Sequence, residues 1–249
     1  MRKWISAVFL VPLTFAFAFT AIIARLFSRR KGPTQVMRTW ARTLMILYGV
    51  KVEIQGLHHV DQARPVIYMP NHASMVDIPV LIYALPVDLR FIFKKSLLYV
   101  PVFGQAIQFM GMVPIDRANM GKATESLKNA GRQIRAGSHV LVFPEGTRTR
   151  TGKLLNFKKG GFYLAIQEQI DIVPISINNS QAIGGVNSLL VNRGEVQVTI
   201  HPPIHIAAYS LEDRHELIKA VRGAIYSGLD GDYREEATLS APQAKSHAQ

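Results

Sequence analysis

An uncharged run of 21 residues near the N-terminus, residues 4–24, constrains the fold of this sequence more than any other feature. It is rich in Phe, Ala, Leu, Val and Ile, and about 20 apolar residues in a helix are enough to cross the hydrocarbon core of a bilayer. Pro12 stands in its middle and predicts a kink. The sequence therefore predicts a membrane protein.

Positive charge surrounds this run. The first carboxylate of the chain is Glu53, so residues 1–52 carry basic side chains only. Residues 35–48 predict an amphipathic helix with Trp40 on its apolar face, and basic helices of this kind lie at membrane surfaces. We therefore expect an anionic phospholipid membrane as a partner. The basic residues of this segment are Arg2, Lys3, Arg25, Arg29, Arg30, Lys31, Arg38, Arg42 and Lys51.

Three interpretations of the N-terminus compete. A secretory signal peptide, cleaved near residues 16–18, is disfavoured because the apolar run is too long and a basic cluster follows it. A single transmembrane span is compatible with the run, although basic residues at both of its ends give no orientation. A helix pair, residues 4–24 and 35–48 joined by a turn at 31–34, is equally compatible and would be embedded from one membrane face. The last two interpretations stay open.

Composition removes several classes of protein. The chain has 249 residues and is 48% hydrophobic, which is enough for a buried core and excludes wholesale disorder. It contains no cysteine, so disulfides, a thiolate nucleophile and cysteine-ligated metals are excluded. A formal net charge of +12 predicts an anionic partner. No helix-turn-helix, zinc-finger or aromatic RNA-binding signature is present, so nucleic acid is not expected.

From residue 51 onward, short apolar runs alternate with amphipathic segments. This alternation predicts an α/β domain over residues 51–230, with a mostly parallel sheet flanked by helices. Residues 1–50 are expected to form the membrane-anchoring region, and the polar residues 231–249 a disordered tail. The expected strands are 52–55, 66–69, 90–93, 112–115, 139–143, 172–177 and 195–200. The expected helices of the domain are 74–84, 121–136, 161–169 and 210–227.

A histidine and an aspartate follow the second expected strand. His72 stands where α/β proteins bind ligands, at the carboxyl end of a parallel strand. Asp77, one turn into the next helix, is able to fold back and orient the imidazole as a general base. The simpler alternative is that Asp77 only caps this helix together with Ser74. A metal site is not predicted, because the spacing supplies two ligands and no second cluster accompanies it.

Two further loops carry arginine at expected strand ends. One is Ile115-Asp116-Arg117, and the other is the segment 143–150, in which Glu145, Gly146, Thr147 and Arg148 follow one another. The guanidinium fork matches phosphate oxygens, and glycine lets backbone amides approach an anion closely. Each loop alone is as well explained by solvated charge. Together with the histidine loop, they favour a phosphate-binding site.

Four blocks in this order resemble the glycerolipid acyltransferase family, and within it the branch that acylates 1-acyl-sn-glycerol 3-phosphate. The blocks are Asn71-His72-x4-Asp77, Ile115-Asp116-Arg117, Phe143-Pro144-Glu145-Gly146-Thr147-Arg148 and Val173-Pro174-Ile175. They run from about residue 66 to 177, and the basic, apolar N-terminus also fits that branch. Pro114 stands where an aromatic or aliphatic residue is common, a small departure.

The resemblance implies a glycerol-3-phosphate acyltransferase-like fold and a membrane-bound enzyme. The acyl donor would be a thioester substrate, acyl-CoA or acyl-carrier protein, with no cofactor, and the product of acylating the sn-2 hydroxyl of lysophosphatidic acid would be phosphatidic acid. His72 would remove the hydroxyl proton, with Asp77 as its orienting partner. The acceptor site would comprise Arg117, Glu145, Gly146, Thr147 and Arg148. The active site is expected on the cytoplasmic side of the cell inner membrane or its equivalent.

Two alternatives remain beside this interpretation. In the first, the protein is an acyltransferase whose acceptor is a different lysophospholipid. In the second, it is a non-catalytic, membrane-anchored binder of anionic lipids. Because the chain has no cysteine, we expect direct acyl transfer in a ternary complex rather than an acyl-enzyme. Ser74 is close enough to His72 in sequence to be acylated, but its expected capping role disfavours this.

Overall fold

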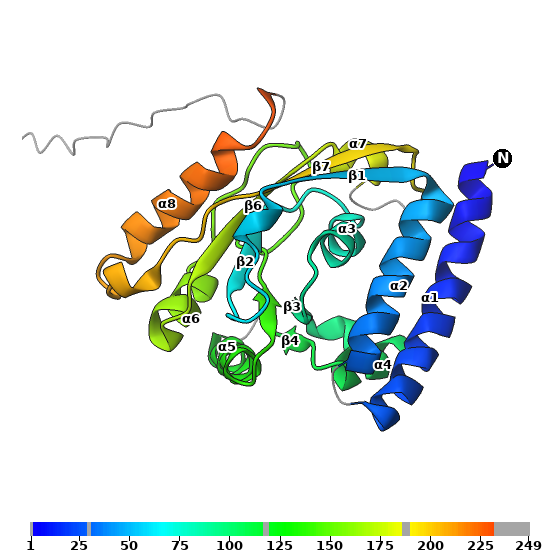
Figure 1. Cartoon of the computed structure of the whole chain (residues 1–249), viewed down its shortest axis with the longest axis horizontal. Coiled ribbons are helices and arrows are strands. Elements are labelled where there is room, and N and C mark those ends of the chain that lie inside the picture. The colour runs from blue at the N-terminus through cyan, green and yellow to red at the C-terminus, as the bar shows by residue number, and fades with distance from the viewer. Residues whose placement is uncertain (1, 29–30, 117–119, 186–189, 232–249) are drawn as a thin grey trace, which may run out of the picture.

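The N-terminal region forms two long helices that lie side by side and run in opposite directions (Figure 1). The structure is a computed structural model that describes residues 2–28, 31–116, 120–185 and 190–231. Helix α1 spans Arg2–Phe27 and α2 spans Lys31–Tyr48. Both expected helices are therefore present, but the turn expected at residues 31–34 is wrong, because these residues form the first turn of α2. Pro33 fits there, since the N–H groups of a first turn have no partner within the helix.

A seven-stranded sheet forms the centre of the described part of the chain. Its strand order is β1-β7-β6-β2-β5-β3-β4, and every neighbouring pair is parallel except β6 and β7. The α/β fold with a mostly parallel sheet is thereby confirmed. The strands are β1 Val50–Gln55, β2 Ile67–Pro70, β3 Leu89–Lys94, β4 Val113–Ile115, β5 His139–Leu141, β6 Ile172–Asn178 and β7 Gly194–Ile200.

Helices cover both faces of this sheet (Figure 1). One face packs against α2, α3 (Asp77–Ala84) and α4 (Phe103–Phe109), and the other against α5 (Met120–Arg135), α6 (Gly160–Glu168) and α8 (Arg214–Ser227). Short elements complete the order: η1 (Leu57–His59), η2 (Lys95–Tyr99), α7 (Ser180–Ile183) and η3 (Ile206–Ala208). The expected tail at 231–249 lies, apart from its first residue, outside the described residues.

The sheet separates two hydrophobic cores. Along β2, the fully buried Tyr68 faces the core on the α2 side, whereas Ile67 and Met69 face the core on the α5 side. Because the central strands are buried on both faces, their sequences are nearly continuous apolar runs. Met37 and Leu44 of α2 belong to the first core, so α2 is packed into the domain and does not stand apart from it.

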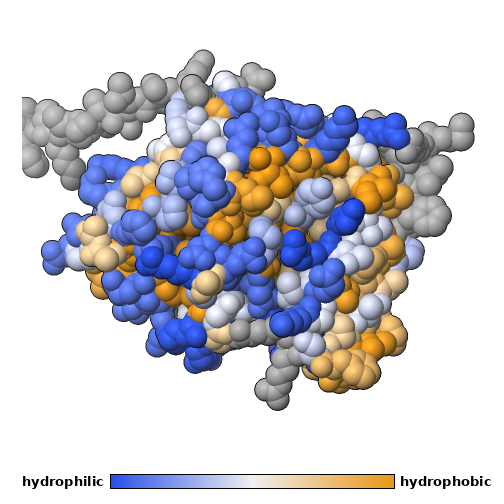
Figure 2. Space-filling view, in the orientation of Figure 1, coloured by the Kyte–Doolittle hydropathy of each residue, from blue (hydrophilic) through white to orange (hydrophobic). Residues whose placement is uncertain are grey.

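Helix α1 is the exception to this burial. It packs against α2 and α4, but much of it faces outward, and Phe19 and Phe27 are 60% and 87% exposed. Figure 2 shows apolar side chains gathered at the lower right, where Figure 1 has the C-terminal end of α1. Among the described residues, α1 is the one helix long and apolar enough to cross a membrane, with the window Leu10–Phe27 only 11% buried.

Candidate active site

His72 and Asp77 meet at the carboxyl end of β2, as the sequence predicts. The Nδ1 atom of His72 lies 2.7 Å from Oδ2 of Asp77, and the two side chains are 14% and 0% exposed. A carboxylate only accepts hydrogen bonds, so Nδ1 carries the proton of the neutral ring and the Nε2 lone pair is left to act as a base. The pair therefore has the geometry of an oriented general base.

Backbone amides fix the aspartate in turn. Oδ2 of Asp77 accepts hydrogen bonds from the N–H groups of Ala73 (2.9 Å) and Ser74 (2.8 Å). The expected start of the helix at Ser74 is wrong: α3 begins at Asp77, and the Ser74 hydroxyl accepts from the N–H of Val76 and donates to the Gly184 carbonyl. The Asp77 carboxylate thus binds two loop amides and the imidazole at the same time.

The loop of His72 is fastened to the segment that follows β5. The His72 N–H donates to Oε1 of Glu145 (2.6 Å), and its carbonyl accepts from the N–H of Thr149 (2.9 Å). The imidazole stacks on the ring of Phe143, with 3.7 Å between the centroids. Asn71 pairs through both ends of its amide with the backbone of Ile177 on β6. The first and third blocks are therefore joined around one imidazole, and Asn71 ties them to β6.

Glu145 is almost completely buried, with 1% of its surface exposed. Its second oxygen, Oε2, accepts the N–H of Leu155 at 2.9 Å, so both carboxylate oxygens are engaged by backbone. Burial raises the pKa of Glu145 to about 7, against the opposing effect of these two hydrogen bonds. Sequence reasoning assigned Glu145 to the acceptor site, and in the structure its carboxylate points at the backbone of two loops.

The residues that follow Glu145 include a guanidinium nitrogen without a hydrogen-bond partner among the described residues. Gly146 has φ +72°, a conformation that glycine adopts without strain. No hydrogen bond or ion pair is found for Thr147 or Arg148 within the described part of the chain, and the buried Nη1 of Arg148 lacks a partner. A buried guanidinium nitrogen without a partner is costly, which indicates a position for an anionic ligand.

The second arginine of the expected site, Arg117, lies outside the described residues. Its neighbours show where this block belongs: Ile115 ends β4 opposite Lys94 on β3, and Nζ of Lys95 lies 4.0 Å from the Asp116 carboxylate. The block is thus at the same carboxyl edge of the sheet as His72. The fourth block, around Pro174, is the fully buried middle of β6 and contributes to the core.

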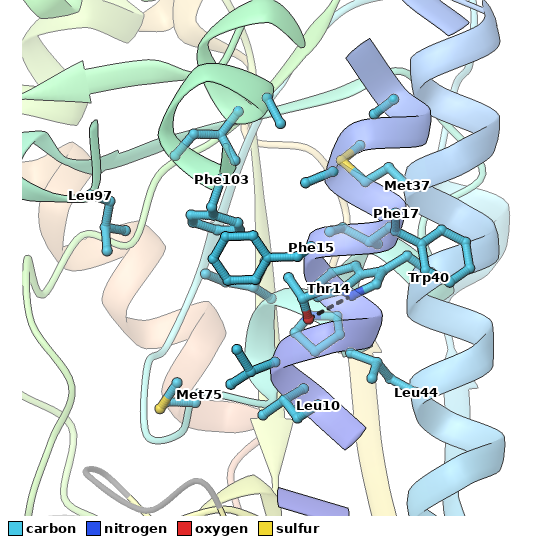
Figure 3. Close-up of a pocket in the computed structure, with 18 of the residues that line it drawn as sticks. Leu10, Thr14, Phe15, Phe17, Met37, Trp40, Leu44, Met75, Leu97 and Phe103 are labelled. Atoms are coloured by element: carbon cyan, nitrogen blue, oxygen red, sulfur yellow. Dashed lines mark hydrogen bonds between the residues drawn. The ribbon is translucent and has the colours of Figure 1, made fainter. Parts of the chain in front are cut away.

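A cavity of about 490 Å³ opens beside the histidine loop, lined almost entirely by apolar side chains. Figure 3 shows Met75 and Leu10 toward one end and Phe103 and Met37 toward the other, with Phe15 between them. The Trp40 indole N–H donates to the Thr14 hydroxyl at 3.2 Å and fixes α1 against α2 beside the cavity. Sequence reasoning missed this cavity, although the apolar Met75 and Val76 between His72 and Asp77 were a local signal.

Comparison with known proteins gives this site a context. The family model described as Acyltransferase matches residues 51–178, a span that contains all four blocks. The chloroplastic 1-acyl-sn-glycerol-3-phosphate acyltransferase of Arabidopsis thaliana is 35% identical over 179 residues, covering 71% of this chain and 50% of that protein. The human 1-acyl-sn-glycerol-3-phosphate acyltransferase alpha is 32% identical over 209 residues, covering 80% and 74%.

A solved structure shares the fold. The crystal structure of the 1-acyl-sn-glycerophosphate acyltransferase PlsC from Thermotoga maritima superposes with a TM-score of 0.77 at 24% identity, and the match covers 92% of this chain and 96% of that one. The chain spans about half the length of the chloroplastic relatives from Arabidopsis thaliana and Brassica napus.

Proposed function

The chain belongs to the acyltransferase family, and we propose that it transfers a fatty acyl chain from a thioester donor to the free sn-2 hydroxyl of lysophosphatidic acid, giving phosphatidic acid. The observation that carries this proposal is the His72–Asp77 pair, whose loop lines the apolar cavity and is hydrogen-bonded to Thr149, the residue after Arg148. The Nη1 atom of Arg148 has no hydrogen-bond partner among the described residues. A base near an apolar cavity and a cation suits a reaction that joins an acyl chain to a phosphorylated alcohol.

His72 acts as the general base. Its Nε2 takes the proton from the acceptor hydroxyl as the oxygen attacks the thioester carbonyl, a step for which a positioned base supplies roughly two to four orders of magnitude in rate. The imidazolium that forms is stabilised by the buried Asp77 carboxylate, whose Oδ1 has no hydrogen-bond partner among the described residues. A new C–O bond forms in this step, and the carbonyl oxygen becomes an oxyanion.

Collapse of this intermediate breaks the C–S bond. The thiolate of the donor leaves and takes up the proton that His72 holds, which restores the neutral imidazole. Transfer is direct, because the chain has no cysteine and the buried Ser74 hydroxyl already donates to the Gly184 carbonyl. We assign the same chemistry to acyl-CoA and to acyl-carrier protein, since the thioester is common to both.

The acceptor phosphate binds to the loop that follows β5. Arg148 supplies the charge, Thr147 offers its backbone N–H, Gly146 shapes the turn at φ +72°, and we assign Arg117 as a second guanidinium for the phosphate. Glu145 belongs to this loop and contributes by anchoring it to the histidine loop. Each such charge-assisted hydrogen bond is worth about 1.5–3 kcal/mol, so removing the phosphate from the acceptor should weaken its use strongly.

The apolar cavity holds the acyl chain of the donor. It begins at Met75 and Val76, within the loop that presents His72, so a thioester carbonyl beside the imidazole has its alkyl chain directed between α1, α2 and α4. Burial of each methylene group stabilises the complex by about 0.8 kcal/mol.

Both N-terminal helices lie in one leaflet of the membrane. Helix α2 buries Met37, Leu44 and Tyr48 in the core of the domain, and α1 lies antiparallel along α2. A bilayer-spanning α1 would draw that core into the lipid. Embedding α1 along the membrane surface instead places its exposed Phe19 and Leu26 among the acyl chains, with the basic residues near anionic headgroups. We place the active site on the cytoplasmic side, where these acyl donors occur.

The test is acyl transfer by membranes that contain the wild-type protein, His72→Ala or the matched control His215→Ala, whose imidazole is exposed on α8. His72→Ala is expected to lose at least a hundredfold in kcat, and the control none. Wild-type turnover by His72→Ala would refute the mechanism. A panel of lysophospholipids with different headgroups distinguishes lysophosphatidic acid from other acceptors, and absence of transfer to every member would favour the non-catalytic lipid binder.

A further inference from the structure

Arg222 of helix α8 binds Leu154 and Leu155, which lie outside the four blocks, in the later part of the loop that follows β5. Its Nη1 donates to the carbonyl of Leu155 at 2.6 Å, and its Nη2 to that of Leu154 at 3.2 Å. The guanidinium also lies over the ring of Phe157, 5.3 Å from its centroid. These contacts use the planar fork of arginine, which an ammonium group does not reproduce. Arg222 therefore fixes the backbone of the loop between β5 and α6.

The same loop continues to the histidine. The peptide group of Leu155 accepts from Arg222 through its carbonyl, while its own N–H donates to Oε2 of Glu145 (2.9 Å). The other oxygen of Glu145 accepts the backbone N–H of His72 (2.6 Å). The structure thus holds a continuous path from Arg222 through Leu155 and Glu145 to the backbone of His72.

We propose that Arg222 is a positioning residue for the transfer reaction: through Leu155 and Glu145 it sets the backbone of His72 and so the direction of its Nε2. This inference rests on the proposed function, because it concerns the same imidazole. Arg222 does not touch the reacting atoms. A shift of the loop by a fraction of an ångström is passed to the base, and misplacing a catalytic group by about 1 Å costs up to a hundredfold in rate.

Electrostatics supports the same role. The charged groups that act on the Glu145 carboxylate are Asp77 of α3 and Arg222 of α8, and His72 reaches it through its backbone N–H. Burial and, to a smaller extent, the Asp77 charge raise the pKa of Glu145 to about 7, while the two backbone hydrogen bonds and the Arg222 charge act to lower it. Only the ionised carboxylate accepts both backbone N–H groups. Activity is therefore expected to fall as the pH drops through about 7, and removal of Arg222 to move that loss to higher pH.

The test compares Arg222→Met, which removes charge and fork, with Arg222→Lys and with Lys219→Met as the matched control, because Lys219 is 74% exposed on the same helix. Arg222→Met is expected to lower kcat about tenfold with little change in the KM of the donor or of the acceptor. It should also move the acidic fall of kcat to higher pH. In Arg222→Lys, the acidic fall of kcat should return toward the pH at which it occurs in the wild type. Lys219→Met should match the wild type in kcat, in both KM values and in the pH profile.

Two results would overturn the proposal: an unchanged kcat and pH profile in Arg222→Met, or a loss of activity that matches the loss of folded protein measured by circular dichroism. A second readout does not depend on turnover. Diethyl pyrocarbonate modifies neutral imidazole nitrogens, and mass spectrometry follows its rate at His72. Arg222→Met should change that rate severalfold and Lys219→Met should not. If wild-type protein fails to acylate lysophosphatidic acid, the proposed function falls, while the modification rate still decides the role of Arg222.

Discussion

Filling the apolar cavity should change which acyl donors the enzyme prefers. Ala18 on α1 is 6% exposed and lines the cavity, eight residues beyond Leu10, or about 12 Å along the helix at 1.5 Å per residue. Ala18→Leu places three more carbon atoms in the open space, and both residues favour a helix. The variant should therefore keep its fold and offer a shorter channel.

The magnitude follows from the methylene groups that no longer fit. If three carbon atoms of the side chain displace three methylenes of the donor, a long chain loses about 3 × 0.8, or roughly 2.4 kcal/mol, of binding. That is about a 50-fold fall in kcat/KM for long donors, because 1.4 kcal/mol corresponds to a factor of ten. Donors short enough to end before Ala18 should keep the wild-type value.

The assay measures kcat/KM for a series of saturated acyl-CoA donors with lysophosphatidic acid as the acceptor. Ala16→Leu is the matched control, because it makes the same change on the same helix at an exposed position that does not line the cavity. An unchanged ranking of donors in Ala18→Leu would refute the assignment of the cavity to the acyl chain. So would an equal shift in Ala16→Leu, since that would attribute the change to membrane binding.

Four further predictions concern the site itself. Asp77→Asn places an amide among three N–H donors and should lower kcat at least a thousandfold with little change in KM, measured at saturating donor. Arg148→Met should lower kcat/KM ten- to a hundredfold for phosphorylated acceptors and spare monoacylglycerol, with the exposed Arg150→Met as its control. Gly146→Ala should destabilise the fold by about 1–2 kcal/mol in thermal unfolding, because φ is +72° and the new Cβ meets a lysine stem at 3.2 Å. For Glu145, the raised pKa means that the folded protein binds its proton more tightly than the unfolded chain. Between pH 4.5 and 7 the free energy of unfolding should then fall by about 3 kcal/mol as the pH rises, and Glu145→Gln should lack that slope.

The parts of this fold that the sequence predicts are those with local signals. The central strands appear as short apolar runs because they are buried on both faces, whereas β1 and β7 alternate between buried and exposed side chains. The ends of each strand are predicted to within about two residues. The His72–Asp77 pair is equally local, since five residues of one loop separate its members. Errors arise where a local signal has two meanings. Gly32-Pro33 predicts a turn, but proline also fits the first turn of a helix, and in the structure it lies in the first turn of α2.

Features that depend on distant contacts escaped prediction. Glu145 has its second hydrogen bond to Leu155, ten residues away, and that residue is held by Arg222, 67 residues further on. The periodicity of the sequence does not predict this chain of hydrogen bonds from Arg222 through Leu155 to Glu145. The helix α7 has four residues, too few for a periodic pattern. Charge and composition show which residue types are available, but only the packing shows that Glu145 faces the backbone and not the surface.

The lining of the cavity gives the N-terminal helices a second role besides membrane attachment. Residues 1–50 are expected to anchor the protein to the membrane, and α1 and α2 also supply Leu10, Phe15, Ala18 and Trp40 to the wall that α3 and α4 complete. If α1 lies in the leaflet, the acyl chain of the donor is bound between the membrane anchor and the domain. Removing α1 would then expose the apolar side of the cavity and abolish transfer even in detergent, where an anchor is not needed. Activity of an α1-deleted protein in detergent micelles would show instead that the helix serves attachment alone.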